Sequence, residues 1–167
     1  MKKIIYKSIG IIHSPFKDTK GMPIQSEGAK GINGTIEIDP EYAAGLKDLE
    51  EFSHIILLYH FHLSKSCSLT VKPFLDKVMR GVFATRAPRR PNPIGVSVVK
   101  LLRVEGCTLH IEEVDVVDGT PLLDIKPYVP KFDVKQAKRI GWLSKTVNRV
   151  YKTKADDRFK AKKPKKR

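Results

Sequence analysis

Residues Gly81–Leu101, GVFATRAPRRPNPIGVSVVKL, decide the fold of this chain. The apolar run Gly81–Thr85 predicts one strand, and the β-branched run Val96–Leu102 predicts a second. Proline fixes its own φ and restricts the residue before it, so the segment between these strands cannot be helical. It therefore forms a stiff loop that contains three arginines and three prolines: Arg86, Arg89, Arg90, Pro88, Pro91 and Pro93.

This stiff loop is suited to binding an anion. It would hold planar guanidinium groups in place for a carboxylate or a phosphate at a small entropic cost. A rigid surface loop whose arginines are only hydrated is the alternative. Charged loops between strands commonly carry functional sites, which favours the first interpretation.

Further strands are predicted on both sides of the loop. Val96–Val104 and Thr108–Val116 form two long strands joined by a turn at Gly106, and Ser53–His62 is the most apolar run, typical of a buried central strand. Hairpin-length connections make neighbouring strands antiparallel, and closure removes exposed edges. The sequence predicts a mainly-β fold, a small antiparallel β-barrel with short helices. Its other strands are expected at Ile4–Tyr6, Ile9–His13, Gly34–Ile38, Thr70–Pro73 and Leu122–Tyr128.

Two helical regions are predicted. Asp39 before Pro40 is typical of a helix start, and a short helix should cover Tyr42–Leu46. Asp133 should cap a last helical region in which apolar residues recur every three or four positions up to Val150. We therefore divide the chain into a barrel domain, 1–133, a C-terminal helical extension, 134–151, and a basic tail, 152–167.

The net charge of +14, from 32 basic and 18 acidic residues, indicates a polyanionic partner. The tail has almost no apolar content beyond Phe159 and is predicted to be disordered. We favour an arm that contacts nucleic acid. A solubilising end and a nuclear import signal are the alternatives.

Composition excludes several other classes of protein. The sequence has no run of eighteen apolar residues and no signal-peptide pattern at its start, which predicts a soluble, cytoplasmic protein. Its two cysteines, Cys67 and Cys107, have no CxxC spacing, so neither a disulfide framework nor a cysteine zinc site is expected.

Few side chains suggest nucleophilic or metal chemistry. There is no GxSxG motif and no cysteine–histidine pair at a suggestive spacing. His60 and His62 share one face of a strand, but no acid cluster completes a ligand set, and we predict no metal site. Asp115, Asp118 and Asp124 lie near turns, where they could bond their own backbone or close over a polar ligand opposite the arginines.

Several motifs together resemble the TrmO family, also called TsaA-like or YaeB-like proteins. They are FATR ending at Arg86, RPNPIGVSVVKL (Arg90–Leu101), DGTPLLDIKPYVPKFD (Asp118–Asp133), IGIIHSPF (Ile9–Phe16) and GMPIQ (Gly21–Gln25). The resemblance spans roughly Tyr6 to Asp133. It implies a methyltransferase that uses S-adenosyl-L-methionine on a small β-barrel. It also implies a homodimer, with its site near the subunit interface, that methylates N6 of threonylcarbamoyladenosine at position 37 of tRNA.

The resemblance also implies site residues. Cofactor contacts would fall on Pro23, Ile24, Gln25, His62, Leu63, Arg86, Val96, Asp118, Gly119, Thr120, Pro121 and Leu122. Substrate contacts would fall on Arg89, Arg90 and Asn92. Methyl transfer is an in-line displacement that depends on positioning and needs no covalent enzyme intermediate. A proton must leave the acceptor nitrogen, and Asp118, Asp124, His60 and His62 are the candidates for accepting it.

Two other functions fit the sequence. One is a methyltransferase that uses the same cofactor on another RNA or on a small molecule. The other is a non-catalytic RNA-binding β-barrel, in which the arginines of the stiff loop and the tail contact phosphates.

Overall fold

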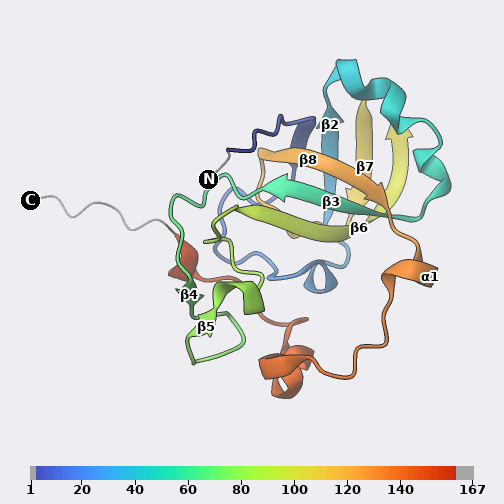
Figure 1. Ribbon diagram of the computed structural model, residues 1–167. Helices are drawn as coiled ribbons and strands as arrows, with labels where there is room; N and C mark the ends of the chain where they lie inside the picture. The colour runs from blue at the N-terminus through green and yellow to red at the C-terminus, as the bar shows by residue number, and fades with distance from the viewer. Residues whose placement is uncertain (1–2, 161–167) are drawn as a thin grey trace, which may run out of the picture.

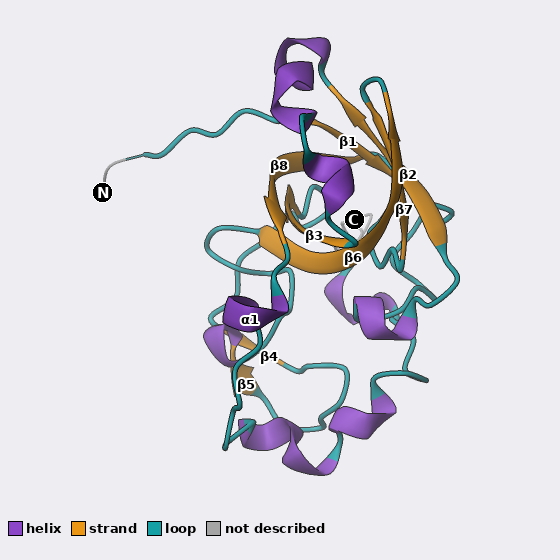
Figure 2. Cartoon of the chain, turned by 90° about the vertical axis from the view of Figure 1, so that its right-hand side faces the viewer, coloured by secondary structure: helices purple, strands orange, loops and turns teal. Residues whose placement is uncertain are grey.

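A computed structural model describes residues 3–160 of the chain. Six antiparallel strands close into a barrel in the order β1-β2-β7-β6-β3-β8 (Figure 1; seen end-on in Figure 2). The barrel strands are β1 Gly10–His13, β2 Asn33–Ile38, β3 His54–His60, β6 Ile94–Glu105, β7 Thr108–Glu112 and β8 Thr120–Pro127. A separate two-stranded sheet pairs β4, Thr70–Val71, with β5, Arg80–Gly81. The predicted β-barrel is confirmed.

The barrel interior is filled by side chains that alternate along each strand. In β3, Ile55, Leu57 and Tyr59 are buried while their neighbours are partly exposed, so the strand is buried on one face and not on both as its apolar run had suggested. In β6 the inward positions are Gly95, Ser97, Val99 and Leu101, which alternate with residues that face outward.

The predicted hairpin between β6 and β7 is present. Gly106 makes the turn with a φ of 59°, a left-handed conformation that glycine adopts at little cost. The register shifts between Leu101 and Arg103, a bulge that bends this long strand around the barrel. β7 ends at Glu112, four residues earlier than predicted, because the next residue, Glu113, has a φ of 72° and leaves the ladder.

Two predicted strands are wrong. Most of Gly81–Thr85 forms a 3-10 helix, η4 (Val82–Ala84), because Val82 turns inward to pack with Val71 and Ala87 in a second small core. Ile4–Tyr6 is not part of the sheet, and its apolar side chains are exposed. The first strand is therefore only β1.

The remaining helices are short. They are η1 Ser26–Gly28, η2 Pro40–Leu46, η3 Leu49–Glu51, α1 Pro130–Asp133, η5 Gly141–Lys145, η6 Val147–Arg149 and η7 Asp157–Phe159. The predicted short helix after Asp39 is present as η2, although the Asp39 side chain makes no capping hydrogen bond.

The amphipathic helix predicted after Asp133 is wrong. Residues 134–150 contain only the 3-10 turns η5 and η6. Asp133 Oδ2 accepts a hydrogen bond from Val129 N at 2.7 Å, and so caps the turn before it rather than a helix after it. Gly141 has a φ of 59°, which interrupts any continuous helix, and Val134 is exposed.

Residues 154–160, which we call the C-terminal strap, were predicted to be disordered and instead pack against the body of the protein. Ala155 N donates to Met22 O and Gly21 N donates to Ala155 O, each at 2.8 Å. Phe159 packs on Phe74, with ring centroids 5.2 Å apart. In Figure 1 the red end of the described residues lies beside β4 and β5. The rest of the predicted tail, 161–167, lies outside the described residues, and the division into three domains stays a prediction.

The described residues were also searched for membrane-spanning helices and for clusters of metal-binding side chains. Within residues 3–160 no helix has the length and apolar character needed to cross a membrane. The same residues contain no group of three or more histidine, cysteine, aspartate or glutamate side chains able to hold a metal ion.

Candidate active site

A pocket of about 750 Å³ opens at the end of the barrel where β3 ends and β6 and β8 begin. Its volume is in the range of small-molecule and cofactor sites. The walls come from the loop 17–25, the end of β3 with residues 61–65, Phe74, the stiff loop that contains the arginines, the start of β6, the segment 115–120 and the C-terminal strap.

Three polar side chains form a connected group at the base of the pocket. Ser97 Oγ donates to Asp115 Oδ1 at 2.6 Å and lies 3.0 Å from the hydroxyl of Tyr59. Burial raises the pKa of Asp115 to about 6, although the hydrogen bond from Ser97 and the charge of Arg86 both lower it. Burial and the nearby Asp115 raise the pKa of Tyr59 as well.

Arg86 forms a charged part of the pocket wall. Its Nη1 donates to Gln25 Oε1 at 2.5 Å, and Gln25 Nε2 donates to Ile24 O at 2.7 Å. These bonds join the stiff arginine loop to the Pro23–Gln25 segment. A guanidinium has five donors in a plane, so this one retains donors for a carboxylate.

The other two arginines of the loop hold the protein backbone. Arg90 Nη1 donates to Val82 O at 3.0 Å and to Thr85 O at 2.8 Å, which fixes the turn before Arg86. Arg89 Nη2 donates to Lys160 O at 2.7 Å and so fastens the strap. Arg90 lines the pocket, whereas Arg89 and Asn92 do not.

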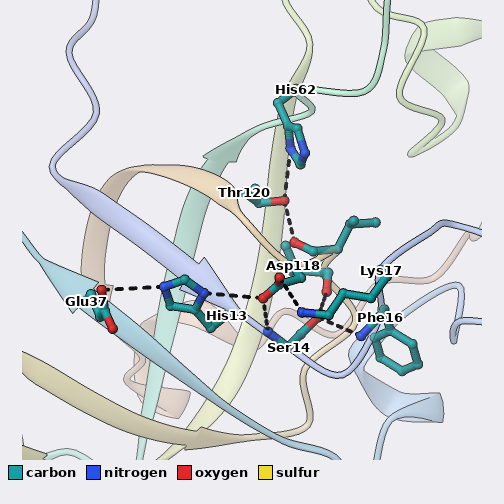
Figure 3. Close-up of polar contacts among 10 residues, drawn as sticks. His13, Ser14, Phe16, Lys17, Glu37, His62, Asp118 and Thr120 are labelled. Atoms are coloured by element: carbon teal, nitrogen blue, oxygen red, sulfur yellow. Dashed lines mark hydrogen bonds and ion pairs between the residues drawn. The ribbon is translucent and has the colours of Figure 1, made fainter.

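Asp118 anchors the loop that follows β7 (Figure 3). Its Oδ2 accepts from Lys17 Nζ at 2.6 Å, and its Oδ1 accepts from Ser14 N at 3.1 Å and lies 3.3 Å from His13 Nδ1. The hydrogen bond from Lys17 is the main reason why the pKa of Asp118 falls to about 2. The side chain is therefore a strongly held anion and a weak base.

The same loop positions Thr120 against His62 (Figure 3). Thr120 Oγ1 donates to Val117 O at 2.7 Å and lies 3.2 Å from His62 Nδ1. Because the threonine proton is used on Val117, Nδ1 of His62 is the donor to Thr120. Desolvation, with the charges of His60 and Lys65, lowers the pKa of His62, so its ring is neutral at pH 7.

Comparison with known proteins identifies the family. The profile of the tRNA-methyltransferase O N-terminal domain matches residues 11–134. The chain belongs to the TrmO family. It is 60% identical over 156 residues to a probable S-adenosyl-L-methionine-binding protein of Pyrococcus abyssi, covering 93% of this chain and 85% of that protein.

Other relatives are named as tRNA enzymes. The tRNA (adenine(37)-N6)-methyltransferase of Escherichia coli is 39% identical over 140 residues, which cover 78% of this chain and 60% of the enzyme. The crystal structure of TrmO from Pseudomonas aeruginosa superposes with a TM-score of 0.71 at 38% identity, covering 84% of this chain and 63% of that one. This chain thus spans about three fifths of the bacterial TrmO proteins and most of the P. abyssi protein.

Within this TrmO-family barrel, most of the residues predicted to contact the cofactor lie on the pocket. Those that line it are Pro23, Ile24, Gln25, His62, Leu63, Arg86, Val96 and Thr120. The others do not: Gly119 forms the turn with a φ of 73°, Leu122 is buried in the barrel core, and Asp118 and Pro121 flank the turn.

Only one of the four candidates for the proton acceptor lines the pocket. That residue is His62; His60 and Asp118 are not on the pocket surface. Asp124 borders a second pocket, of about 400 Å³, at the opposite end of the barrel and pairs with Lys126 at 2.8 Å.

The polar group at the base of the pocket was not predicted from the sequence. Ser97 occupies an inward position of β6, where the alternation of the strand would demand an apolar residue, and that mismatch is the signal that could have found it. Tyr59 was hidden within an apolar run. Asp115 was grouped with Asp118 and Asp124, and nothing in the sequence distinguishes the three.

Proposed function

We propose that this protein is an S-adenosyl-L-methionine-dependent tRNA methyltransferase that methylates N6 of threonylcarbamoyladenosine at position 37. The observation that carries the proposal is the pocket, in which Arg86, Gln25 and Thr120, from three separate motifs of the family, line one cavity. The names of the relatives support the same reaction, since they combine S-adenosyl-L-methionine binding with adenine-37 methylation of tRNA.

The residues of the pocket fit this cofactor. Arg86 presents a planar donor that suits the carboxylate of its methionine part. Apolar side chains such as Met22, Ile24 and Phe61 surround the cavity and suit the adenosine part. When bound, the cofactor supplies an electrophilic methyl group on a sulfonium sulfur. The chain's own contribution is to hold donor and acceptor in line and to exclude water.

The charge of the chain supports tRNA as the partner. A net charge of +14 favours phosphate contacts, and Lys17, Lys65 and Lys160 stand around the pocket. Threonylcarbamoyladenosine also carries a carboxylate, for which Arg89, Arg90 and Asn92 remain our proposed contacts. Because Arg89 and Arg90 already bind backbone carbonyls, they would act through their remaining donors.

We also propose a cytoplasmic homodimer with the site near the subunit interface. Leu63, Ile94 and Val96 line the pocket and are each more than a third exposed, which gives the pocket an apolar rim. A second copy of the chain placed on this rim would bury it and narrow the opening.

Mass spectrometry of nucleosides tests the reaction. The protein is incubated with S-adenosyl-L-methionine and two preparations of tRNA, one with threonylcarbamoyladenosine and one without. We expect a gain of one methyl group on that nucleoside alone. Methylation of another nucleoside would replace the proposed acceptor, and tight tRNA binding without methylation of either preparation would favour a non-catalytic RNA-binding module.

A further inference from the structure

The polar group at the base of the pocket has a defined direction of hydrogen bonding. An ionised carboxylate only accepts, so Ser97 Oγ donates to Asp115 Oδ1. The single hydroxyl proton of Ser97 is then used, so the Tyr59 hydroxyl donates to Ser97 Oγ. Tyr59 on β3 and Ser97 on β6 therefore both direct protons towards Asp115, which lies just after β7.

Asp115 differs from the other carboxylates on the pocket. Asp18 pairs with Lys160, and Asp156 pairs with Arg158 at 2.7 Å. Those partners lower the pKa of both acids. Among the pocket residues of the described chain, Asp115 is the one carboxylate without an ion-pair partner.

The surroundings of Asp115 keep it ionised and basic. Arg86 and Tyr59 are the charged and titratable groups that face it, and Ser97 holds one of its oxygens. With a pKa of about 6, the group is ionised at pH 7 and is still a far better proton acceptor than an exposed aspartate. A general base is most effective when its pKa lies close to the operating pH.

We infer that Asp115 accepts the proton that the acceptor nitrogen loses during methyl transfer, an inference that rests on the proposed function. The acceptor is a ureido nitrogen, whose lone pair is delocalised into the adjacent carbonyl and becomes nucleophilic as its proton leaves. Ser97 and Tyr59 are positioning residues, because they act through the carboxylate of Asp115.

The step balances in atoms and charge. The nitrogen–carbon bond forms as the carbon–sulfur bond breaks, and the pair of electrons from that bond stays on sulfur. The sulfonium becomes a neutral thioether, and the proton on nitrogen passes to the carboxylate of Asp115. One positive and one negative charge are neutralised together within a partly buried site, and Asp115 then returns its proton to solvent.

The test is the single-turnover rate of methylation against pH, with saturating S-adenosyl-L-methionine and tRNA that carries threonylcarbamoyladenosine. For the unmodified protein we expect a rate that rises to a plateau with a midpoint near the pKa of Asp115, about 6. The plateau rate of Asp115→Asn should be lower by a factor of at least about 100. Its calorimetric affinity for S-adenosyl-L-methionine should stay within about tenfold.

Ser97→Ala tests whether Ser97 acts through Asp115. The measurement is the pH midpoint of the methylation rate, which would not shift if Ser97 had only a structural role. The hydrogen bond from Ser97 lowers the pKa of Asp115, so its removal should shift the midpoint to higher pH. Asp48→Asn, at an exposed aspartate outside the active-site pocket, is the matched control and should keep the rate and the midpoint.

Each outcome decides between named alternatives. If the unmodified protein methylates this tRNA and Asp115→Asn keeps its rate and midpoint, the assignment of Asp115 is overturned. A midpoint lost in His62→Gln but kept in Asp115→Asn would give the role to His62. If the unmodified protein leaves the nucleoside unmethylated, the proposed function itself fails. Should Asp115→Asn not fold, an unmoved midpoint in Ser97→Ala would overturn the assignment.

Discussion

Asp115 and Asp118 lie three residues apart, and their surroundings move their pKa values in opposite directions, to about 6 and to about 2. Asp115 is half-buried on the pocket without an ion-pair partner, whereas Asp118 accepts a hydrogen bond from Lys17 at 2.6 Å. One carboxylate is thus available for proton transfer while the other anchors the loop that holds it. Pairs of acids separated in this way commonly divide the work of a site.

The environment of Asp115 should cost the protein stability. Its folded pKa, about 6, lies above the 3.8 of a free aspartate, so the folded state binds more protons than the unfolded state between these two pH values. The free energy of unfolding should therefore fall as the pH rises from 4 to 6. Asp115→Asn should be about 1–3 kcal/mol more stable than the unmodified protein at pH 7 and equally stable near pH 4. Urea unfolding at both pH values measures this, and a less stable variant at pH 7 would contradict it.

Asp118 should behave in the opposite way. Its folded pKa is below the value in the unfolded chain, so its contribution is present above about pH 4 and disappears as the pH falls towards 2. Asp118→Asn should lower the free energy of unfolding by about 1–2 kcal/mol at pH 7. The difference from the unmodified protein should shrink in acid. Asp124→Asn, at a half-exposed pair with Lys126, is the control and should cost less than about 0.5 kcal/mol.

The ring of Tyr59 covers Gly95 on the facing strand, where the two residues are register partners. A Cβ at Gly95 would lie 2.5 Å from Tyr59 Cζ, so Gly95→Ala should cost about 1–3 kcal/mol through overpacking. Chemical denaturation measures the cost, which should shrink in a Tyr59→Ala background. Gly45→Ala, where a Cβ meets nothing within 4 Å, is the matched control. An equal cost in both glycine variants would show that the ring is not responsible.

Arg86 should dominate binding of the cofactor carboxylate. Arg86→Ala should weaken calorimetric affinity for S-adenosyl-L-methionine by about 10- to 100-fold without loss of the fold. Arg86→Lys keeps the charge but not the planar donors, so it should recover only part of the affinity. Arg139→Ala removes an exposed arginine away from the pocket and should bind normally. An unchanged affinity in Arg86→Ala would remove this residue from the site.

The strap and the residues after it should serve different ligands. Deleting residues 161–167, which contain five basic residues, should weaken tRNA binding and flatten its salt dependence, because fewer counterions are released. Cofactor affinity should not change. Phe159→Ala, which removes part of the pocket wall, should show the reverse pattern. Titrations at several salt concentrations measure both, and equal salt slopes with and without 161–167 would exclude a role for that segment.

Much of the barrel could be predicted from the sequence because its signals are local. The alternation in β6, the glycine turn at Gly106 and the apolar run of β3 each depend on neighbouring residues. One side of the pocket was also predictable, because the family motifs GMPIQ and FATR contain Pro23–Gln25 and Arg86, which meet there.

The predictions failed where contacts between residues far apart in the sequence outweigh the local preference for a strand or a helix. Val82 leaves the predicted strand because it packs with Val71 and Phe159, which is 77 residues further along the chain. The recurrence of apolar residues every three or four positions predicted a helix after Asp133, but Val134, Ile140 and Val147 on its expected apolar face are exposed and Gly141 turns the chain. The role of Asp115 depends on its burial and that of Asp118 on its contact with Lys17, 101 residues away, and neither feature can be read from the sequence.

The C-terminal strap gives the pocket a wall whose backbone makes fewer hydrogen bonds than the strands of the barrel. Its backbone contacts with the loop 17–25 are few, chiefly the two hydrogen bonds between Ala155 and residues Gly21 and Met22, whereas each barrel strand is bonded along both edges. Amide hydrogen exchange at Ala155 should therefore proceed through a local opening of much lower free energy than exchange within β3. A bulky ligand could then enter and leave by displacing the strap, and a bound ligand that touches Phe159 would slow the exchange at Ala155.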